Sequence, residues 1–201
     1  MNDVIKVINN RVSLRKYQNK EISKEHEELI IESAIKAPTA GNQCLYSIIK
    51  IKDEDTKKIL SKSCDNQPFI AKAPLVLVFV ADQQKWFDYY KLRGVKEFSE
   101  MKNLSFEAPQ ESDLLLACED ALIAAQNAVI AAESLGIGSC YIGDILENYE
   151  LHRELLNLED GTFPITMLCF GYYEEPAKRI HRKRFDSKFI VFDEKYRKLS
   201  E

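Results

Sequence analysis

The sequence has no CxxC pair, and its five cysteines are an odd number spread along the chain. An odd, scattered set argues against a disulfide framework and against a zinc knuckle. The three histidines are also far apart and show no HExxH spacing, so the sequence predicts no metal site. Most of the cysteines have apolar or small neighbours, which is typical of buried and unreactive thiols.

An excess of positive charge is also missing. The net charge is -4 and the pI is about 5.6, which argues against general nucleic-acid binding. The first residues, MNDVIKVINN, lack the apolar core of a signal peptide, and no apolar run is expected to be long enough to cross a bilayer. We therefore expect a cytoplasmic protein without a membrane partner.

Length and composition indicate a single globular domain. The chain has 201 residues, of which 45% are hydrophobic and 30% are charged, and this is enough to bury one core. No internal repeat, low-complexity linker or domain break interrupts it. We therefore predict one domain over residues 1–201.

Apolar periodicity predicts helices and strands in an irregular order. The predicted helices cover residues 3–10, 24–36, 54–63, 112–135 and 147–156, and a further helix lies within 83–110. The predicted strands cover residues 45–52, 74–82, 137–144 and 164–173, and residues 189–199 form either a last strand or a tail that reaches a partner. Because strands and helices do not alternate regularly, the order favours an α+β fold over a doubly wound sheet.

Two segments are unusual in composition. The helix predicted at 112–135 has almost no charged face, which places it at the centre of the fold or in a dimer interface. The segment 83–110 is rich in aromatic residues, among them Trp86 and Tyr90. This segment either caps the core or walls a substrate pocket.

The glycine-rich stretch LGIGSCYIG contains Gly136, Gly138 and Gly143 but does not fit a Rossmann dinucleotide site. That fingerprint needs a strand before the glycines and a helix after them, and here the order is reversed. The stretch is either a helix C-cap followed by a tight turn, or a ledge of small residues that lets backbone N–H groups approach a flat ligand.

Basic residues alternate with apolar ones in the stretch NNRVSLRKY. If this stretch is extended, Arg11, Ser13 and Arg15 share one side with Tyr17, and the apolar residues between them face the other way. Neighbouring members of this row then start roughly 7 Å apart, and the row suits a phosphate, since each guanidinium group can donate two parallel hydrogen bonds to an oxyanion. The alternative is a solvated basic turn whose arginines pair with carboxylates.

A second basic cluster has the same alternate spacing near the other end of the chain, at Arg182 and Arg184. Folding can bring the two clusters to one phosphate. The polar loop APTAGNQ, residues 37–43, can contact the same ligand, and the small residues of IGSCYIG can support it. Together these segments predict a ligand that is phosphorylated, flat and partly apolar.

Four segments resemble the motifs of one protein family, in the same order and at similar distances. RVSLRKY resembles an R-x-S-x-R opening, APTAGNQ resembles A-P-S/T-A/S-x-N-x-Q, LGIGSCYIGDI resembles L-G-L-G-x-x-W-I-G, and RKR fits a late basic motif. On these segments, which cover essentially the whole chain, the sequence resembles the nitroreductase-like family of FMN-dependent NAD(P)H oxidoreductases. The resemblance implies an α+β fold with a central, mostly antiparallel sheet surrounded by helices, and an entwined homodimer.

The resemblance also implies which residues hold the FMN phosphate. Arg11 and Ser13 are expected to contact the phosphate, with Arg182 and Arg184 on the same group. Arg15 is expected to lie along the ribityl chain and to reach the N1/O2 side of the ring. A cation at that place stabilises the reduced, anionic flavin.

Further contacts with the flavin ring follow from the same resemblance. Ile142 and Gly143 are expected against one face of the ring, with the backbone N–H of Gly143 near N5. Gln67 is expected at the pyrimidine edge. The other subunit is expected to contribute one loop, through Pro38, Thr39, Ala40 and Asn42.

The sequence departs from the family pattern at a few positions. Val12 stands where a second Arg or His is common, and it is expected to act through its backbone. Gln43 comes one residue earlier than the usual N-x-Q spacing, so that Cys44 occupies the place of the glutamine. Tyr141 stands where Trp is common. These departures affect the loop and the substrate pocket more than the phosphate contacts.

The implied reaction is a ping-pong cycle in which NADH or NADPH gives hydride to the flavin and a nitroaromatic, quinone or similar conjugated acceptor then takes it. No catalytic side chain is expected, and Trp86 and Tyr90 are expected to line the acceptor pocket. One alternative is another flavin enzyme on this scaffold, such as a dehalogenase or a dehydrogenase. Another is a non-enzymatic flavin-binding redox sensor that uses Cys44 or Cys64.

Overall fold

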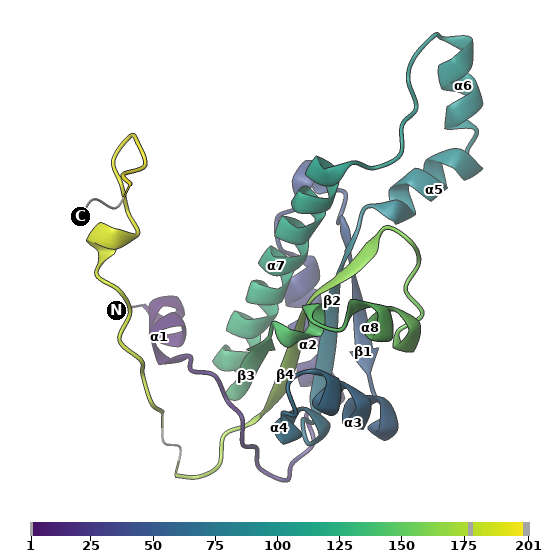
Figure 1. Cartoon of the computed structure of the whole chain (residues 1–201). Helices are drawn as coiled ribbons and strands as arrows, with labels where there is room; N and C mark the ends of the chain where they lie inside the picture. Colours follow the sequence, from purple (N-terminus) through teal and green to yellow (C-terminus); the bar gives the residue numbers. More distant parts are fainter. Residues whose placement is uncertain (1, 177–178, 199–201) are drawn as a thin grey trace.

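The centre of the molecule is an antiparallel sheet of four strands (Figure 1). The computed structural model describes residues 2–176 and 179–198. The sheet contains β1 (Tyr46–Ile51), β2 (Leu75–Asp82), β3 (Ile137–Ile142) and β4 (Thr162–Tyr172) in the order β1-β2-β4-β3. Helices surround it, so the predicted α+β fold with a central antiparallel sheet is confirmed.

The central strand β2 is apolar along its length because both faces of the sheet are covered. Leu77 and Phe79 lie in the core on one face, and Val76, Val78 and Val80 lie in the core on the other. Each of the five side chains is at most 2% exposed. This double burial explains the continuous apolar run in the sequence.

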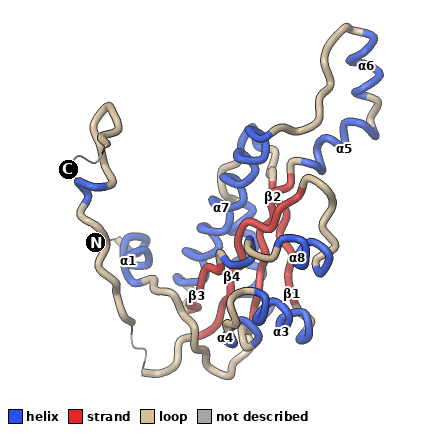
Figure 2. The backbone as a smooth tube through the Cα atoms, viewed as in Figure 1, coloured by secondary structure: helices blue, strands red, loops and turns tan. Residues whose placement is uncertain are grey.

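On one face of the sheet lie α2 (Lys24–Ile35) and α7 (Glu111–Ser134) (Figure 2). As predicted, α2 begins after Ser23, whose hydroxyl oxygen accepts a hydrogen bond from the backbone N–H of His26 at 3.2 Å. The long helix α7 places small side chains against the sheet, and this allows a close approach. The fully buried alanines of α7 are Ala117, Ala121, Ala124, Ala125, Ala128 and Ala132.

The other face of the sheet is covered by shorter elements. These are α3 (Glu54–Ser63), α4 (Pro68–Ala71), η2 (Asp144–Leu146) and α8 (Tyr149–Leu155). Leu60 of α3 is fully buried in this second core. Because α4 and η2 cover the same face of the sheet, the polar residues beside them can meet.

Two arms leave this body on opposite sides of α7 (Figure 1). One holds α5 (Gln84–Leu92) and α6 (Val95–Met101), so the aromatic segment contains two helices. The other consists of α1 (Asp3–Asn10) and the C-terminal segment with η3 (Ser187–Phe189). Residues 189–198 form no strand, so the first of the two alternatives for the C-terminus is wrong for the described part of that segment.

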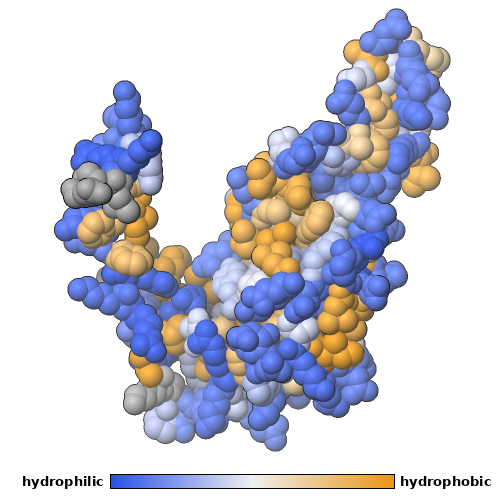
Figure 3. Space-filling model, viewed as in Figure 1, coloured by the Kyte–Doolittle hydropathy of each residue, from blue (hydrophilic) through white to orange (hydrophobic). Residues whose placement is uncertain are grey.

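By length and composition alone, α7 is apolar enough to cross a membrane. The expectation that no apolar segment is long enough to cross a bilayer is therefore wrong by length and composition. The core helix of a soluble protein also satisfies these two criteria. One side of α7 packs on the sheet. Its other side is apolar too (Figure 3), through the exposed side chains of Leu115, Leu116, Leu122 and Ile123.

Candidate functional site

Residues 11–18 run along the open edge of the sheet beside β3. Ser13 forms a parallel bridge with Ser139, and the backbone N–H of Leu14 donates to the Ser139 carbonyl oxygen at 2.9 Å. A second bridge follows at Tyr17. The first basic cluster is therefore fixed by backbone pairing with the sheet, and its serine side chain is exposed.

Two glycines make room for this segment. Gly138 of β3 and Gly171 of β4 are direct partners in the sheet. A Cβ atom at Gly138 would stand 2.6 Å from Cδ2 of Leu14, and one at Gly171 would overlap the Tyr17 ring. The Tyr17 ring lies over Gly171 on the side where Arg15 also lies, since both side chains approach Phe69. The ring is more deeply buried than the exposed Arg15, because only a glycine leaves space for it there.

Arg11 and Arg15 have no carboxylate partner among the described residues. The Arg15 guanidinium lies 6.0 Å from the centre of the Phe69 ring. Burial raises the pKa of the Cys140 thiol, and the nearby Arg15, Ser13 and Arg11 act in the opposite direction. The alternative in which these arginines pair with carboxylates therefore fails in the described part of the chain. Both guanidinium groups remain available for an oxyanion.

The end of β3 meets the start of α4 at a polar contact. Gln67 donates from Nε2 to the Cys64 carbonyl oxygen at 3.0 Å and to Asp144 Oδ2 at 2.9 Å. Asp144 directly follows Gly143, which is exposed and has open space where a Cβ atom would stand. The side chain of Ile142 is buried in the core, so only its backbone is available to a ligand here. The structure thus brings the predicted residues Gln67 and Gly143 together.

The predicted loop contact is fixed by a buried carboxylate of α7. Asp120 is 2% exposed, and its two oxygens accept hydrogen bonds from the backbone N–H groups of Ala40 at 2.9 Å and Leu45 at 3.1 Å. These contacts hold the short helix η1 (Ala40–Asn42) against α7. The loop fixed in this way carries the predicted residues Pro38, Thr39, Ala40 and Asn42.

Arg179 is the basic residue that lies beside the N-terminal segment. Its guanidinium pairs with Glu133 of α7 and donates to the Asn10 carbonyl oxygen at 2.8 Å. It also lies 4.0 Å from the centre of the Tyr173 ring, and the Tyr173 hydroxyl donates to Glu133 at 2.8 Å. This cluster fixes the end of α1, where the chain continues into Arg11.

Sequence reasoning missed this cluster and considered only Arg182 and Arg184 in the basic run, whose place at a phosphate stays a prediction. Both of these residues are exposed on the C-terminal arm, and within one chain the structure does not place them with the first basic cluster. A signal for the Arg179 pairing was present in the helix predicted at 112–135. Asp120 and Glu133 stand on the buried face of an otherwise apolar helix, and a buried carboxylate requires a partner.

The predicted loop and the arginine segment are not together in one chain. The loop is attached to Asp120 of α7 and the arginine segment to Glu133, and these positions are about 20 Å apart along a helix of 1.5 Å rise per residue. The predicted pocket residues Trp86 and Tyr90 lie on the side of this loop. Nε1 of Trp86 donates a hydrogen bond to the Gln43 carbonyl oxygen at 2.8 Å. The ring of Tyr90 lies 5.7 Å from that of Trp86.

The family model of the nitroreductase family matches residues 8–172. The chain belongs to the nitroreductase family. Among the relatives of this chain is an FMN reductase [NAD(P)H] of Bacillus subtilis, which is 33% identical over 183 residues. The match covers 91% of this chain and 70% of the relative.

Solved structures of nitroreductases share the fold. NfrA2 of B. megaterium superposes with a TM-score of 0.84 at 31% identity, covering 98% of this chain and 76% of the other. The NADPH:FMN oxidoreductase of Vibrio harveyi, solved with NAD+, gives a TM-score of 0.86 at 24% identity, covering 99% of this chain and 80% of the other. At that identity the second likeness supports the fold alone.

Proposed function

We propose that this nitroreductase is an FMN-dependent oxidoreductase that passes hydride from NADH or NADPH to a conjugated acceptor such as a quinone or a nitroaromatic. The observation that carries the proposal is the pair of arginines without carboxylate partners, Arg11 and Arg15, fixed along β3 on the side of Gly143. The FMN reductase of Bacillus subtilis supports the choice of cofactor and donor.

The side chains at this edge of the sheet fit FMN in their chemistry. Arg11 and Ser13 offer a planar fork and a hydroxyl to a phosphate, and Arg15 supplies a further cation. The side-chain carbonyl oxygen of Gln67 accepts no hydrogen bond from the described residues and suits an N–H donor on the edge of a ring. The open space at Gly143 suits a flat ring that approaches the backbone.

FMN, when bound, supplies the hydride chemistry, and the chain supplies binding and orientation. Arg15 keeps a positive charge beside the site and so favours a negatively charged ligand. Gly143 keeps one side of the site free of a side chain. We propose that donor and acceptor occupy the same place in turn, which makes the cycle ping-pong, and that no side chain of the chain acts as acid or base. The enzyme would work in the cytoplasm, where NAD(P)H is available.

The same proposal needs a second copy of the chain. In one chain the loop of η1 is attached about 20 Å along α7 from the arginine segment, so a partner's loop is the one that completes the site. Val4, Ile5 and Ile8 of α1 are exposed, and so are the outer leucines of α7. We propose an entwined homodimer that covers these apolar faces and brings Trp86 and Tyr90 to the acceptor.

The C-terminal basic residues have a place in this proposal. Arg182 and Arg184 lie on the arm that also carries α1, and both side chains are exposed. We propose that the arm folds back in the dimer and adds them to the phosphate. The alternative of a redox sensor has little support from Cys64, because its side chain is fully buried and burial raises its pKa to about 12.

An absorption spectrum of the purified protein tests the proposal directly. We expect the bands of oxidised flavin, either as purified or after incubation with FMN, and we expect anaerobic NADH or NADPH to bleach them. A colourless protein that does not take up FMN would overturn the assignment. Flavin bands without turnover of quinones or nitro compounds would keep the cofactor and replace the acceptor class.

A further inference from the structure

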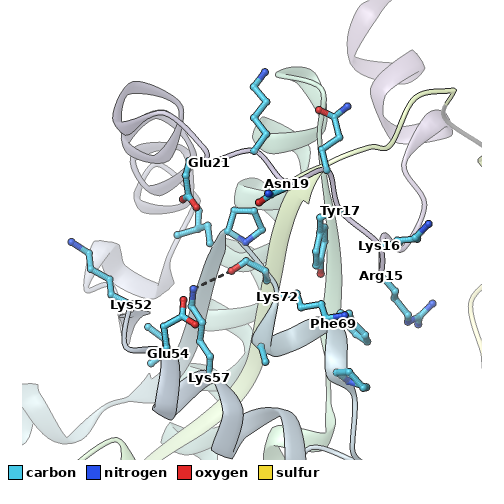
Figure 4. A pocket seen from close by; sticks show the side chains of 18 of the residues that line it. Arg15, Lys16, Tyr17, Asn19, Glu21, Lys52, Glu54, Lys57, Phe69 and Lys72 are labelled. Carbon is cyan, nitrogen blue, oxygen red and sulfur yellow. Dashed lines mark hydrogen bonds between the residues drawn. The ribbon is translucent and has the colours of Figure 1, made fainter.

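A cleft of about 1020 Å³ lies beside the arginine segment (Figure 4). It is lined by residues 15–21, by the end of β1, and by parts of α3 and α4. Arg15 and Phe69 form its wall on the side of the proposed flavin site, while Lys57 of α3 lies on the other side. The cleft is large enough for a small organic ligand.

The lining of the cleft is positively charged on a chain whose net charge is -4. Its lining contains seven basic residues, lysine or arginine, and four glutamates, which gives an excess of three positive charges. Two of the glutamates are already neutralised inside the cleft wall, by the ion pairs Lys16–Glu174 and Lys50–Glu27. The lining residues without an ion pair to another described residue include Arg15, Lys20, Lys52, Lys57 and Lys72, with Glu21 and Glu54.

Lys57 is the most informative of these residues. Its side chain is only 8% exposed, although lysine is rarely buried without a charged partner. Its ammonium group donates one hydrogen bond, to the Ala73 carbonyl oxygen at 3.1 Å, and makes no ion pair with a described carboxylate. An ammonium group can donate three hydrogen bonds, so two remain for another acceptor.

Tyr17, which also lines this cleft, carries a second buried donor, its hydroxyl. The hydroxyl has no hydrogen-bond partner among the described residues, and burying a hydroxyl in this way is costly. The Tyr17 ring lies 6.5 Å from that of Phe69, and Figure 4 shows its hydroxyl pointing from the N-terminal segment toward α4. Two buried donors with unused hydrogen bonds therefore line one positively charged cleft.

We propose that this cleft is a second anion site, separate from the flavin phosphate site, which takes the phosphate oxyanion of a small molecule. Lys57 is the central contact, since an oxyanion there would neutralise its charge and accept its remaining hydrogen bonds. The exposed ammonium of Lys72 and the hydroxyl of Tyr17 add to the binding. Inorganic or metabolite phosphate is one source of this group, and a phosphate of the nicotinamide donor is the other. The site itself does not depend on the proposed flavin chemistry.

The proposal can be tested by titrating the protein with pyrophosphate in a calorimeter. FMN is present in excess, so that the flavin phosphate site is already filled. We expect saturable binding that Lys57→Met weakens by about tenfold or more, the loss expected for one charge-assisted contact. The matched control is Lys58→Met, because Lys58 is the next residue of α3, is exposed and lies outside the cleft. No saturable binding, or equal affinity in wild type and Lys57→Met, would overturn the proposal.

Two further variants keep the test decisive if Lys57→Met does not fold. Lys72→Gln and Tyr17→Phe change an exposed residue and a single hydroxyl, and each should weaken pyrophosphate binding by a smaller factor. Unchanged affinity in both would also reject the site. The source of the phosphate follows from steady-state kinetics. A KM that rises for NADPH but not for NADH in these variants assigns the donor's phosphate, and unchanged KM values with weaker pyrophosphate binding assign a separate phosphorylated compound.

Discussion

Two buried carboxylates of α7, one near its middle and one near its C-terminal end, differ in what their surroundings leave unpaired. At Asp120 the buried carboxylate is fully used inside the chain, because both oxygens accept backbone N–H groups of the η1 loop. At Glu133 the carboxylate pairs with Arg179, but Arg11 and Arg15 have no carboxylate partner in the described part of the chain. Charges that are satisfied within the chain determine its shape. Charges left unpaired on a fixed segment are available for a ligand.

The largest effect should come from removing the carboxylate that is fully used. Asp120→Ala leaves two buried N–H groups without an acceptor, and we expect the free energy of unfolding to fall by about 2–5 kcal/mol. Urea denaturation measures this change. Glu119→Ala, at the exposed neighbouring position of α7, is the control and should change stability by less than about 0.5 kcal/mol.

Near the C-terminal end of α7, Glu133→Gln should have a smaller effect on stability. It removes the charged partner of Arg179, whose side chain is 27% exposed, so water replaces part of the interaction. We expect a loss of about 2–3 kcal/mol in the same urea experiment. Asp160→Asn breaks the surface pair with Arg153 as a control and should cost about 0.5 kcal/mol or less. An equal loss in both variants would refute the buried role of Glu133.

Removing an arginine that has no carboxylate partner should weaken ligand binding and leave stability unchanged. Arg11→Ala is expected to raise the FMN dissociation constant about 10- to 150-fold, the loss of a charge-assisted contact of about 1.5–3 kcal/mol. Flavin fluorescence during titration of the apoprotein measures it. Arg153→Ala, which removes a paired surface arginine, is the control. If Arg11→Ala binds FMN as tightly as wild type, the phosphate assignment is wrong.

The smallest effect concerns the acceptor. Trp86→Leu and Tyr90→Leu should change the ratio of kcat/KM between a quinone and a nitroaromatic by a few-fold, while the FMN dissociation constant stays the same. The reason is that Trp86 is hydrogen-bonded to the loop of η1 and Tyr90 packs beside Trp86, so both rings lie away from the arginine segment of the same chain. Steady-state kinetics with the two acceptors measures the ratio, and loss of FMN instead would place these rings in the cofactor site.

Local features of the fold could be predicted from the sequence. Three such features each depend on a few neighbouring residues. They are the helix cap at Ser23, the end of α7 before Gly136, and the apolar run of β2 that is buried on both faces. The contact between Gln67 and the residue after Gly143 could be anticipated from the family resemblance alone, since no local rule joins two segments so far apart in the chain.

The features that could not be predicted depend on distant residues. Arg179 and Arg182 look alike in the basic run, and only the position of Glu133 on the folded helix distinguishes them. The burial of the Tyr17 ring depends on Gly171, which lies on a strand at the other end of the chain and has no side chain beneath the ring. A repeat of two residues predicts which side Tyr17 faces, but only the folded sheet shows how deeply its ring is buried.

The partnered glycines at 138 and 171 also determine when the site can form. The arginine segment packs on the space that these two glycines leave free on the sheet. Its residue Gln18 donates a hydrogen bond to the carbonyl oxygen of Tyr173, which lies 155 residues further along the chain. During synthesis the first basic cluster leaves the ribosome long before β3 and β4, with which it pairs, have been made. The arginine segment must therefore wait for most of the described chain before it can take its place. If the site is as proposed, a growing chain cannot retain FMN until β4 has been made.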